Sequence, residues 1–328
     1  MRLFRGFNHL GVAPQCALTI GNFDGVHRGH QAMLALLRNE ARHRGLPSCV
    51  LTFEPHPRDH FARRSGRDDG APARISTLRD KLGELARCGI DQAIVVPFND
   101  RFCALTPQAF IDDVLVRGLH ARYVLVGDDF CFGAKRAGDY AMLDAAGQAQ
   151  PPGKRFDVAR MLSYEVHGSR VSSSAVRYAL AAGDMTSAAA LLGRPYSISG
   201  HVVHGRKLGR ELGFRTLNVR FAHERPAAMG IFVVQVHGLT PDATPVVGVA
   251  SLGVRPTVEH AGRVLLETHC LDWPDSLGSE GGYGRCIQVD LLHKLHDELS
   301  YESLDALREG IRRDEIDARA WLASQGGR

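Results

Sequence analysis

The sequence predicts two domains of different class: an α/β Rossmann-like domain with a parallel sheet, then a small antiparallel β-barrel with a C-terminal helix. Three observations support this prediction. The chain has 328 residues, more than one average domain needs. Up to about residue 130, short apolar runs alternate with helical patterns, as in βαβ units. After residue 195, strand-like segments separated by Gly and Pro turns replace that alternation.

The first half is expected to be a parallel sheet covered by helices on both faces. Its predicted strands are ALTI (17–20), SCVLTF (48–53), QAIVVPF (92–98) and RYVLVG (122–127). Its predicted helices cover 30–44, 78–88, 107–117, 174–181 and 184–192. Two polar stretches rich in Gly or Pro, 62–74 and 145–155, are predicted to be mobile surface loops. A boundary within 183–195 gives domains 1–185 and 186–328.

The second half is expected to form the barrel. Its predicted strands are GIFVVQVHG (230–238), TPVVGVASLG (244–253), RVLLETHCLD (263–272) and RCIQVDLLHKL (285–295). The final segment, 303–324, is predicted to be a helix packed on the barrel. Its apolar stripe consists of Leu304, Leu307, Ile311, Ala318 and Leu322.

Composition narrows the class of protein. The formal net charge of +4 and the low aromatic content do not favour a nucleic-acid partner. No run approaches the roughly 20 apolar residues of a membrane span, so no membrane partner is expected. The seven cysteines include no C-x-x-C pair, so we expect a reducing, cytoplasmic setting. The sequence contains no heptad repeat, so it does not indicate an oligomeric state.

The stretch GNFDGVHRGH (21–30) follows the first predicted strand. A Gly-containing turn into a helix N-terminus presents backbone N–H groups to an anion, and His27 and His30 would project into the same space. A lone H-x-x-H pattern is more often a helix-face pair or a chance match. A zinc site is disfavoured because two histidines on one turn need a third ligand. The position after a strand favours a phosphate site.

Three other stretches add groups that a phosphate site needs. They are FEPHPR (53–58), GDDFCFGAKRAGD (127–139) and SSSAVR (172–177). The first two follow predicted strands, and the third places hydroxyls and an Arg at a helix start. A Ser there is usually only a helix cap, but hydroxyls, N–H groups and Arg177 together also suit phosphate. Two such groups in one domain indicate a triphosphate held at both ends.

A second group of residues lies in the predicted barrel. GHVVHGRKLGRELGFRTLNV (200–219) combines regularly spaced glycines with basic residues. On its own, this segment is equally consistent with a glycine-punctuated hairpin with solvated charges. Glu267, an acid within an apolar strand, favours a functional site because carboxylates are rarely buried without a partner or a task.

The first-half motifs GNFDGVHRGH, FEPHP, GDDFCFG and VSSSAVR together resemble the FMN adenylyltransferase module of bacterial bifunctional riboflavin kinase/FAD synthetases. These enzymes are nucleotidyltransferases with an H-x-G-H signature, matched by His27, Gly29 and His30. The resemblance implies that the FMN phosphate attacks the α-phosphorus of ATP and releases pyrophosphate. It implies catalytic roles in phosphate stabilisation for His27, His30 and Arg177. The implied ATP and phosphate contacts are Gly21, Asn22, Phe23, Asp24, Gly29, Ser172 and Ser173, and the implied flavin contacts are His56, Pro57, Asp128 and Phe130.

From residue 193 onward the chain resembles the riboflavin kinase module that follows in these enzymes. GRELGFRTLN, GVRPT and ETH carry this resemblance. It implies that Thr216 and Asn218 bind Mg²⁺, and that Glu267 is the general base that takes the proton of the riboflavin 5′-hydroxyl. The further implied contacts are Gly205, Gly209 and Arg210 for ATP and Arg255 for the flavin. The substrates and products are then ATP, riboflavin, FMN and FAD.

The sequence departs from the kinase pattern at several positions. Arg215 stands where the family has proline, Leu217 replaces a small alanine, and Ser251 replaces an asparagine. The loop 273–284 is also longer than usual. We expect these changes to loosen Mg²⁺–ATP or flavin binding.

Three alternatives remain open from the sequence. The barrel could bind flavin without phosphorylating it. The nucleotidyltransferase could use another acceptor, such as a phosphopantetheine or a sugar alcohol phosphate, which leaves GDDFCFG and the barrel unexplained. The barrel could bind RNA or a protein, which predicts a basic surface interleaved with aromatic residues.

Overall fold

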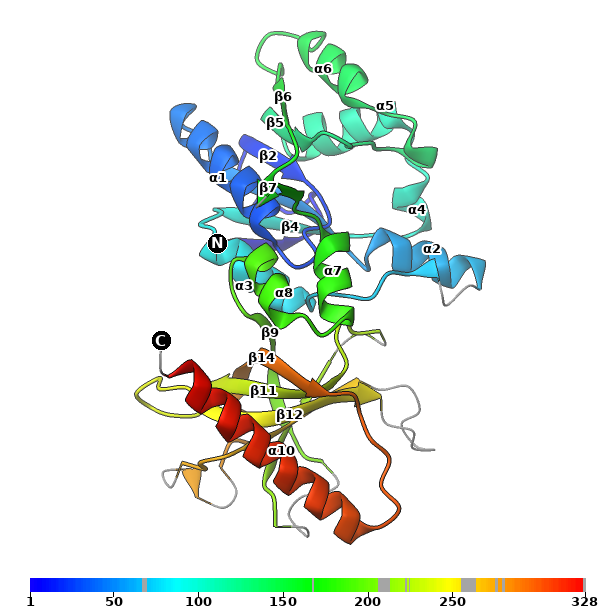
Figure 1. Cartoon of the computed structure of the whole chain (residues 1–328). Helices are drawn as coiled ribbons and strands as arrows, with labels where there is room; N and C mark the ends of the chain where they lie inside the picture. The colour runs from blue at the N-terminus through cyan, green and yellow to red at the C-terminus, as the bar shows by residue number, and fades with distance from the viewer. Residues whose placement is uncertain are drawn as a thin grey trace. The chain divides into compact units, whose positions relative to one another are not determined.

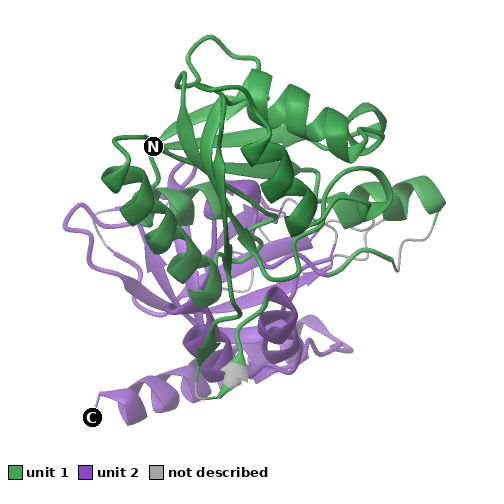
Figure 2. Cartoon of the chain, turned by 90° about the horizontal axis from the view of Figure 1, so that it is seen from above, with its two compact units in different colours: residues 1–72, 81–172 green, residues 73–80, 173–328 purple. Residues whose placement is uncertain are grey.

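The computed structural model describes residues 1–66, 70–166, 168–205, 213–221, 223, 225–254, 264–274, 277–278 and 281–326. The chain forms two compact units (Figure 2). Unit 1 contains residues 1–72 and 81–172, and unit 2 contains 73–80 and 173–328. Each unit has its own hydrophobic core.

Unit 1 contains a six-stranded, fully parallel sheet in the order β1-β4-β3-β2-β5-β6 (Figure 1). The strands are β1 (Arg2–Arg5), β2 (Cys16–Ile20), β3 (Ser48–Glu54), β4 (Gln92–Pro97), β5 (Ala121–Gly127) and β6 (Asp157–Met161). The four strands predicted from apolar runs are confirmed. The two edge strands, β1 and β6, were not predicted because neither contains a compact apolar run: β1 is mostly exposed, and β6 alternates between exposed and half-buried residues.

Helices cover both faces of this sheet, as predicted. The elements are α1 (Arg28–His43), α2 (Pro57–Ser65), α3 (Leu78–Arg87), α4 (Asp100–Cys103), α5 (Pro107–Ala109), a π-helix (Phe110–Gly118), a 3₁₀ turn (Ala134–Arg136) and α6 (Tyr140–Gln148). A short hairpin, β7 (Glu165–Val166) and β8 (Ser169–Arg170), precedes Ser172. One core packs the π-helix on one face of the sheet, and another packs α1 on the opposite face.

Both stretches predicted to be mobile loops are partly ordered structure. Helix α2 occupies the start of 62–74, and α6 occupies the start of 145–155. At the end of the first stretch, the side chain of Arg74 is only 2% exposed. The prediction is wrong where these helices enter the stretches and at Arg74, because polar composition indicates exposure only on average and tertiary contacts can bury an arginine. Residues 149–155, after α6, lie outside helices and strands, as predicted.

The strand order reverses at β2. The chain continues from β2 to β3 and β4 on one side, and returns to β5 and β6 on the other. Ligands of open parallel sheets bind beyond the carboxyl ends of the strands at such a switch point. The fold therefore directs attention to the segments that follow β2 and β5.

The described part of unit 2 contains two short helices, a closed six-stranded barrel and a long helix. The helices are α7 (Ser173–Ala181), α8 (Met185–Leu192) and α10 (Leu304–Gln325). The antiparallel strands follow the order β10-β13-β12-β11-β14-β9. They are β9 (Tyr196–Val203), β10 (Thr216–Arg220), β11 (Gly230–His237), β12 (Val246–Val254), β13 (Val264–Cys270) and β14 (Cys286–His296).

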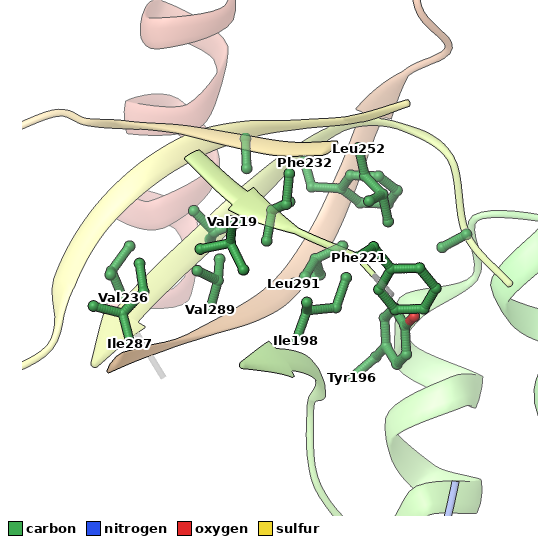
Figure 3. Close-up of a cluster of buried hydrophobic side chains, with 14 of the residues drawn as sticks. Tyr196, Ile198, Val219, Phe221, Phe232, Val236, Leu252, Ile287, Val289 and Leu291 are labelled. Carbon is green, nitrogen blue, oxygen red and sulfur yellow. The ribbon is translucent and has the colours of Figure 1, made fainter. Parts of the chain in front are cut away.

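Four barrel strands match the predicted segments, whereas β9 and β10 come from the stretch that looked like a glycine-punctuated hairpin. These two strands pair with each other and close the barrel. Alternate residues of the strands fill its interior, among them Ile198, Val219 and Phe232 (Figure 3). The closed sheet leaves no exposed edge, and its inner face supplies the core.

Helix α10 packs on the outer face of the barrel. Its Ala318 is fully buried and forms a small cluster with Val233 and Val249. The predicted stripe is wrong at Leu304, which is 57% exposed at the start of the helix. Within the described part of the chain, no helix has the length and apolar character that a membrane span requires.

Candidate active sites

The turn after β2 has an unusual backbone. Phe23 and Val26 have φ values of 49° and 41°, and Gly25, between them, has 86°. L-residues other than Gly rarely adopt this region, so the surrounding structure must hold it. Phe23, Asp24 and Val26 are each at most 1% exposed, which provides that constraint. The strained turn fixes the path of the chain into α1.

The two histidines of the H-x-G-H motif lie together at the start of α1. His27 caps the helix: its Nδ1 accepts a hydrogen bond from the backbone N–H of His30 at 3.3 Å. Their rings stack with centroids 3.6 Å apart and an angle of 16°. The ring of Phe23 lies 5.0 Å from that of His30. The two imidazoles thus form one platform at a helix N-terminus, where the helix dipole favours an anion.

Gly29 makes this arrangement possible. A Cβ atom at this position would lie 3.3 Å from the His27 ring and 3.4 Å from the carbonyl oxygen of Val171. The contact with His27 is tighter than is usual for a side chain, so a larger residue would push the ring by a few tenths of an ångström. The contact with Val171 shows that the segment leading into Ser172 passes next to the motif. Ser172 and the histidine pair are therefore neighbours within unit 1.

His30 is electrostatically distinct. Burial, the neighbouring imidazole of His27 and the ammonium group of Lys81 all lower the pKa of His30 well below 6.5. The ring is therefore neutral at neutral pH. Its Nδ1 is buried and has no hydrogen-bond partner among the described residues. A neutral imidazole with free hydrogen-bonding capacity is suited to a polar ligand.

Lys81 was not singled out from the sequence. It is fully buried on α3, and its Nζ donates hydrogen bonds to Thr52 Oγ1 at 3.3 Å and to the Phe53 carbonyl oxygen at 3.4 Å. Thr52 Oγ1 in turn donates to the carbonyl oxygen of Asn22 at 3.2 Å. In the sequence Lys81 looks like an ordinary helix residue, and only tertiary packing buries its charge near the site.

The segments after β3 and β5 carry the residues predicted to bind flavin. His56 is 5% exposed and caps α2, its Nδ1 accepting from the Arg58 N–H at 3.1 Å. Pro57 is the first residue of that helix. Phe130 stacks on Phe132 with centroids 5.5 Å apart. Because β2, β3 and β5 are adjacent parallel strands, their carboxyl ends place these segments on the same sheet edge as the histidine pair.

Asp128, which directly follows β5, is exposed. Its carboxylate accepts hydrogen bonds from Ser163 Oγ and from Arg170 Nη2, the latter at 3.1 Å. The Ser163 hydrogen bond, assisted by the Arg170 charge, lowers the pKa of Asp128. Asp128 is thus ionised and held in place by the segment that precedes Ser172.

Two residues of the predicted phosphate site, Ser173 and Arg177, lie on α7 in unit 2. There Arg177 Nε donates to the carbonyl oxygen of Ala73 at 2.6 Å. Their roles toward phosphate stay predictions from the sequence. Gly209, Arg210 and Arg255 lie outside the described residues, so their roles also stay predictions.

In the barrel, strand register brings the predicted kinase residues into one row. Asn218 on β10 lies directly opposite Glu267 on β13, and Glu267 lies opposite Ser251 on β12. Directly opposed residues of antiparallel strands point to the same face. Their strand neighbours Leu217, Leu266 and Leu252 belong to the core, so this row lies on the outer face. Glu267 is accordingly half-buried, not enclosed among apolar side chains as its sequence context suggested.

Asn218 is the most buried member of the row, at 3% exposed. A Cβ on Gly205 would lie 2.6 Å from its side-chain nitrogen, so a larger residue at 205 would displace the Asn218 amide. Its Oδ1 is buried and has no hydrogen-bond partner among the described residues. Thr216 lies two residues earlier on the same face of β10. A hydroxyl and an amide oxygen are the hard donors that Mg²⁺ prefers, so these residues fit that ion.

The departures from the kinase pattern have structural roles. The Arg215 guanidinium lies 5.7 Å from the ring centroid of Trp273, within the longer loop. Leu217 is 2% exposed and fills the barrel interior. Ser251 Oγ donates to Glu298 Oε1 at 2.9 Å. Glu298, a carboxylate beside the row, was missed because it follows the last strand in a polar segment.

Comparisons with known proteins agree with this architecture. A family model described as FAD synthetase matches residues 11–175, and one described as riboflavin kinase matches 192–322. The bifunctional riboflavin kinase/FMN adenylyltransferase of Escherichia coli strain K12 is 48% identical over 98% of both chains. The enzyme of the same description from Pseudomonas fluorescens is 42% identical over the full length of both.

A crystal structure described as a macrolide-efflux protein from Streptococcus pneumoniae has a TM-score of 0.75 and 24% identity. It covers 98% of this chain and 100% of its own, and it supports the fold alone. The FAD synthetase match falls mostly in unit 1, and the riboflavin kinase match falls in unit 2. The two full-length relatives are described as having both activities. This chain therefore belongs to the bifunctional riboflavin kinase/FMN adenylyltransferases, which phosphorylate riboflavin to FMN and adenylylate FMN to FAD.

Proposed function

We propose that adenylyl transfer from ATP to FMN is catalysed by the histidine pair at the start of α1. The observation that carries this proposal is the stacked His27–His30 platform at the switch point of the parallel sheet. Attack of an FMN phosphate oxygen on the α-phosphorus breaks the bond to the leaving pyrophosphate, on which negative charge develops. Hydrogen bonds from the two rings and the free N–H groups of α1 stabilise that charge. Lys81 adds a buried positive charge nearby.

The other residues of this site act by placing the substrates. We assign the triphosphate and nucleoside contacts to Gly21, Asn22, Phe23, Asp24, Gly29 and Ser172. The flavin side comprises His56, Pro57, Asp128 and Phe130. Positioning matters here because phosphoryl and nucleotidyl transfers depend on in-line geometry and need no protein nucleophile.

We propose that Glu267 is the general base of the kinase reaction. Its carboxylate takes the proton of the riboflavin 5′-hydroxyl as that oxygen attacks the γ-phosphorus of ATP and ADP leaves. Thr216 and Asn218, with the backbone at Gly205, would hold the phosphates and Mg²⁺ on the same outer face. When bound, Mg²⁺ neutralises charge on the transferred phosphoryl group.

The test is a chromatogram of purified protein with riboflavin and ATP, with Mg²⁺ and after its removal by a chelator. A matched Asn218→Asp variant, which adds a charged oxygen ligand, should shift the Mg²⁺ concentration needed for FMN formation. It should leave the concentration needed for FAD formation from supplied FMN unchanged. An equal shift in both activities would contradict the assignment of Asn218 to the kinase metal.

A further inference from the structure

Three metal-binding side chains converge in unit 1 between α2 and α4. They are His60 on α2 and Asp100 and Cys103 on α4, and their ligand atoms all lie within 4.8 Å of one another. The measured separations are 3.3 Å from His60 Nε2 to Asp100 Oδ1, and 3.9 Å from His60 Nε2 to Cys103 Sγ. None of these residues takes part in the proposed transfer reactions.

One of these separations equals, and the other is close to, the edge of a metal-centred tetrahedron, and the third, from Asp100 to Cys103, lies within 4.8 Å. With Zn–N and Zn–O bonds of about 2.1 Å and a Zn–S bond of about 2.3 Å, tetrahedral angles give edges of roughly 3.3–3.6 Å. The His–Asp separation already fits, and the His–Cys separation must close by only a few tenths of an ångström. From these contacts we infer that His60, Asp100 and Cys103 bind one thiophilic divalent cation of the Zn²⁺ class, with water as the fourth ligand.

The surroundings orient the ligands. Asp100 and Cys103 are three residues apart on one helical turn, which places them on the same side of α4. The His60 ring contacts the Phe61 and Phe98 rings edge-on, with centroids 5.6 and 5.5 Å away. The His60 side chain is 17% exposed and that of Asp100 is 75% exposed. The histidine is therefore fixed, and the carboxylate leaves the site open to solvent.

Three existing interactions compete with a cation, the first being the 3.3 Å contact between His60 Nε2 and Asp100 Oδ1 themselves. Arg64 Nη1 donates to Asp100 Oδ1 at 2.9 Å, so its positive charge lies close to the site. The Cys103 thiol lies 3.4 Å from the Asp100 carbonyl oxygen, to which it donates. Binding must displace the thiol proton, which passes to the buffer, and must move or repel Arg64. These interactions make the predicted affinity depend on pH and on Arg64.

The test uses Co²⁺ as the probe, added to the full-length protein without nucleotide or flavin. A Co²⁺–thiolate bond gives a near-ultraviolet charge-transfer band, which oxygen and nitrogen ligands alone do not give. We expect this band to saturate at one Co²⁺ per chain and to be removed by added Zn²⁺. Cys103→Ser should abolish the band, and His60→Gln, which removes a direct ligand, should weaken Co²⁺ binding by at least the roughly 10–100-fold that loss of an outer-shell partner costs.

Two further variants sharpen the result. Arg64→Gln removes the competing charge and should tighten Co²⁺ binding several-fold. Cys286→Ser, which changes an exposed cysteine of unit 2, should leave the titration unchanged. Absence of a thiolate band in the parent protein, or a band that persists in Cys103→Ser, would overturn the inference. A thermal unfolding scan of each variant verifies that all of them are folded.

Discussion

At the scale of single residues, the geometry and the protonation state of the histidine pair depend on its surroundings. The spacing of His27 and His30 permits stacking, but the positive-φ turn and Gly29 decide that the rings meet face to face. Burial and nearby positive charge then keep His30 neutral. A neutral imidazole keeps one N–H group, which can donate a hydrogen bond to a phosphate oxygen.

Replacing His30 by Ala should reduce FAD formation from FMN by about 10²–10³-fold, because one stabilising donor is lost from the transition state. Riboflavin phosphorylation should remain at the parent rate. Initial rates of both reactions, followed by chromatography of the flavins, measure this. The control is His43→Ala, an exposed histidine at the other end of α1, which should change neither rate. Equal loss of both activities in His30→Ala would show that the two sites are not independent.

Replacing Glu267 by Gln should impair the kinase reaction and spare the adenylyltransferase reaction. Removing a general base typically costs about 10²–10⁴-fold, so FMN formation from riboflavin should fall by that factor. FAD formation from supplied FMN should persist. Glu315→Gln, at a carboxylate that binds His269 at 2.8 Å on the nearby α10, is a control for nonspecific loss of charge. Retention of kinase activity in Glu267→Gln would exclude the assigned base.

At the scale of elements, β10 combines a structural face with a functional face. Leu217 and Val219 point into the barrel core, and Asn218 lies on the outer face opposite Glu267. The larger residue at 217 is part of the barrel core. Whether it also loosens substrate binding stays a prediction. Adjacent side chains of a strand point to opposite faces, so Leu217 points into the barrel while Asn218 points outward. The size of residue 217 therefore affects packing of the barrel core.

Replacing Leu217 by Ala should therefore destabilise the barrel by roughly 2–5 kcal/mol, because it leaves a cavity in a close-packed core. Denaturant unfolding followed by circular dichroism measures this difference in the free energy of unfolding. Leu304→Ala, at an exposed position of α10, should change it by less than about 0.5 kcal/mol. A stable Leu217→Ala variant would mean that the barrel interior repacks around the smaller side chain.

Helix α10 is attached partly through a histidine–carboxylate pair. His296 Nε2 lies 2.8 Å from Asp314 Oδ1, and its Nδ1 lies 2.6 Å from the Asp297 carbonyl oxygen. Burial opposes the charge on His296, but these two hydrogen bonds outweigh it and raise its pKa above 6.5. Burial also raises the pKa of Asp314. Both shifts favour the protonated forms in the folded state.

The sign of the pH dependence follows from linkage. A raised histidine pKa contributes stability that is complete below about pH 6.5 and is lost as the pH rises through the folded-state pKa. We therefore expect thermal stability to decline above that pH, and His296→Gln to flatten the decline. Melting temperatures of parent and variant, recorded across a pH series, measure this decline. The same slope in parent and variant would assign the decline to other groups.

At the scale of the whole molecule, each unit contains a separate row of functional groups. The first lies at the carboxyl edge of the parallel sheet and the second on the outer face of the barrel. Riboflavin incubated with ATP and Mg²⁺ should give FMN first and FAD after a lag, because FMN is the product of one site and the substrate of the other. FAD without an FMN intermediate would contradict this order.

Mixing two variants that each lack a different one of the two activities tests whether FMN passes through solution. Neither His30→Ala nor Glu267→Gln should convert riboflavin to FAD alone. An equimolar mixture should make FAD, because FMN released by the first is a substrate for the second. The measurement is FAD yield against total protein concentration. A mixture that accumulates FMN without FAD would show that FMN does not exchange between molecules.

How much the sequence determines differs between the elements. The parallel strands β2 to β5 and four of the barrel strands were predictable because buried strands require compact apolar runs. The edge strands and the polar helix α2 were not predictable, because they lack a distinctive hydrophobic pattern of their own. Packing against other segments of the fold stabilises such elements. The motifs that follow strands were likewise predictable, because glycine, histidine and proline at fixed spacing mark local turns.

The sequence by itself determined the two-part architecture, the family resemblance and the positions of His27, His30 and Glu267. Only the tertiary structure decided that Lys81 is buried near the histidine pair, that Glu298 lies beside the kinase row, and that Leu217 serves the core. The physical reason is that local patterns encode backbone conformation within a few residues. Burial and charge environment depend instead on contacts between segments far apart in the chain, which no local pattern specifies.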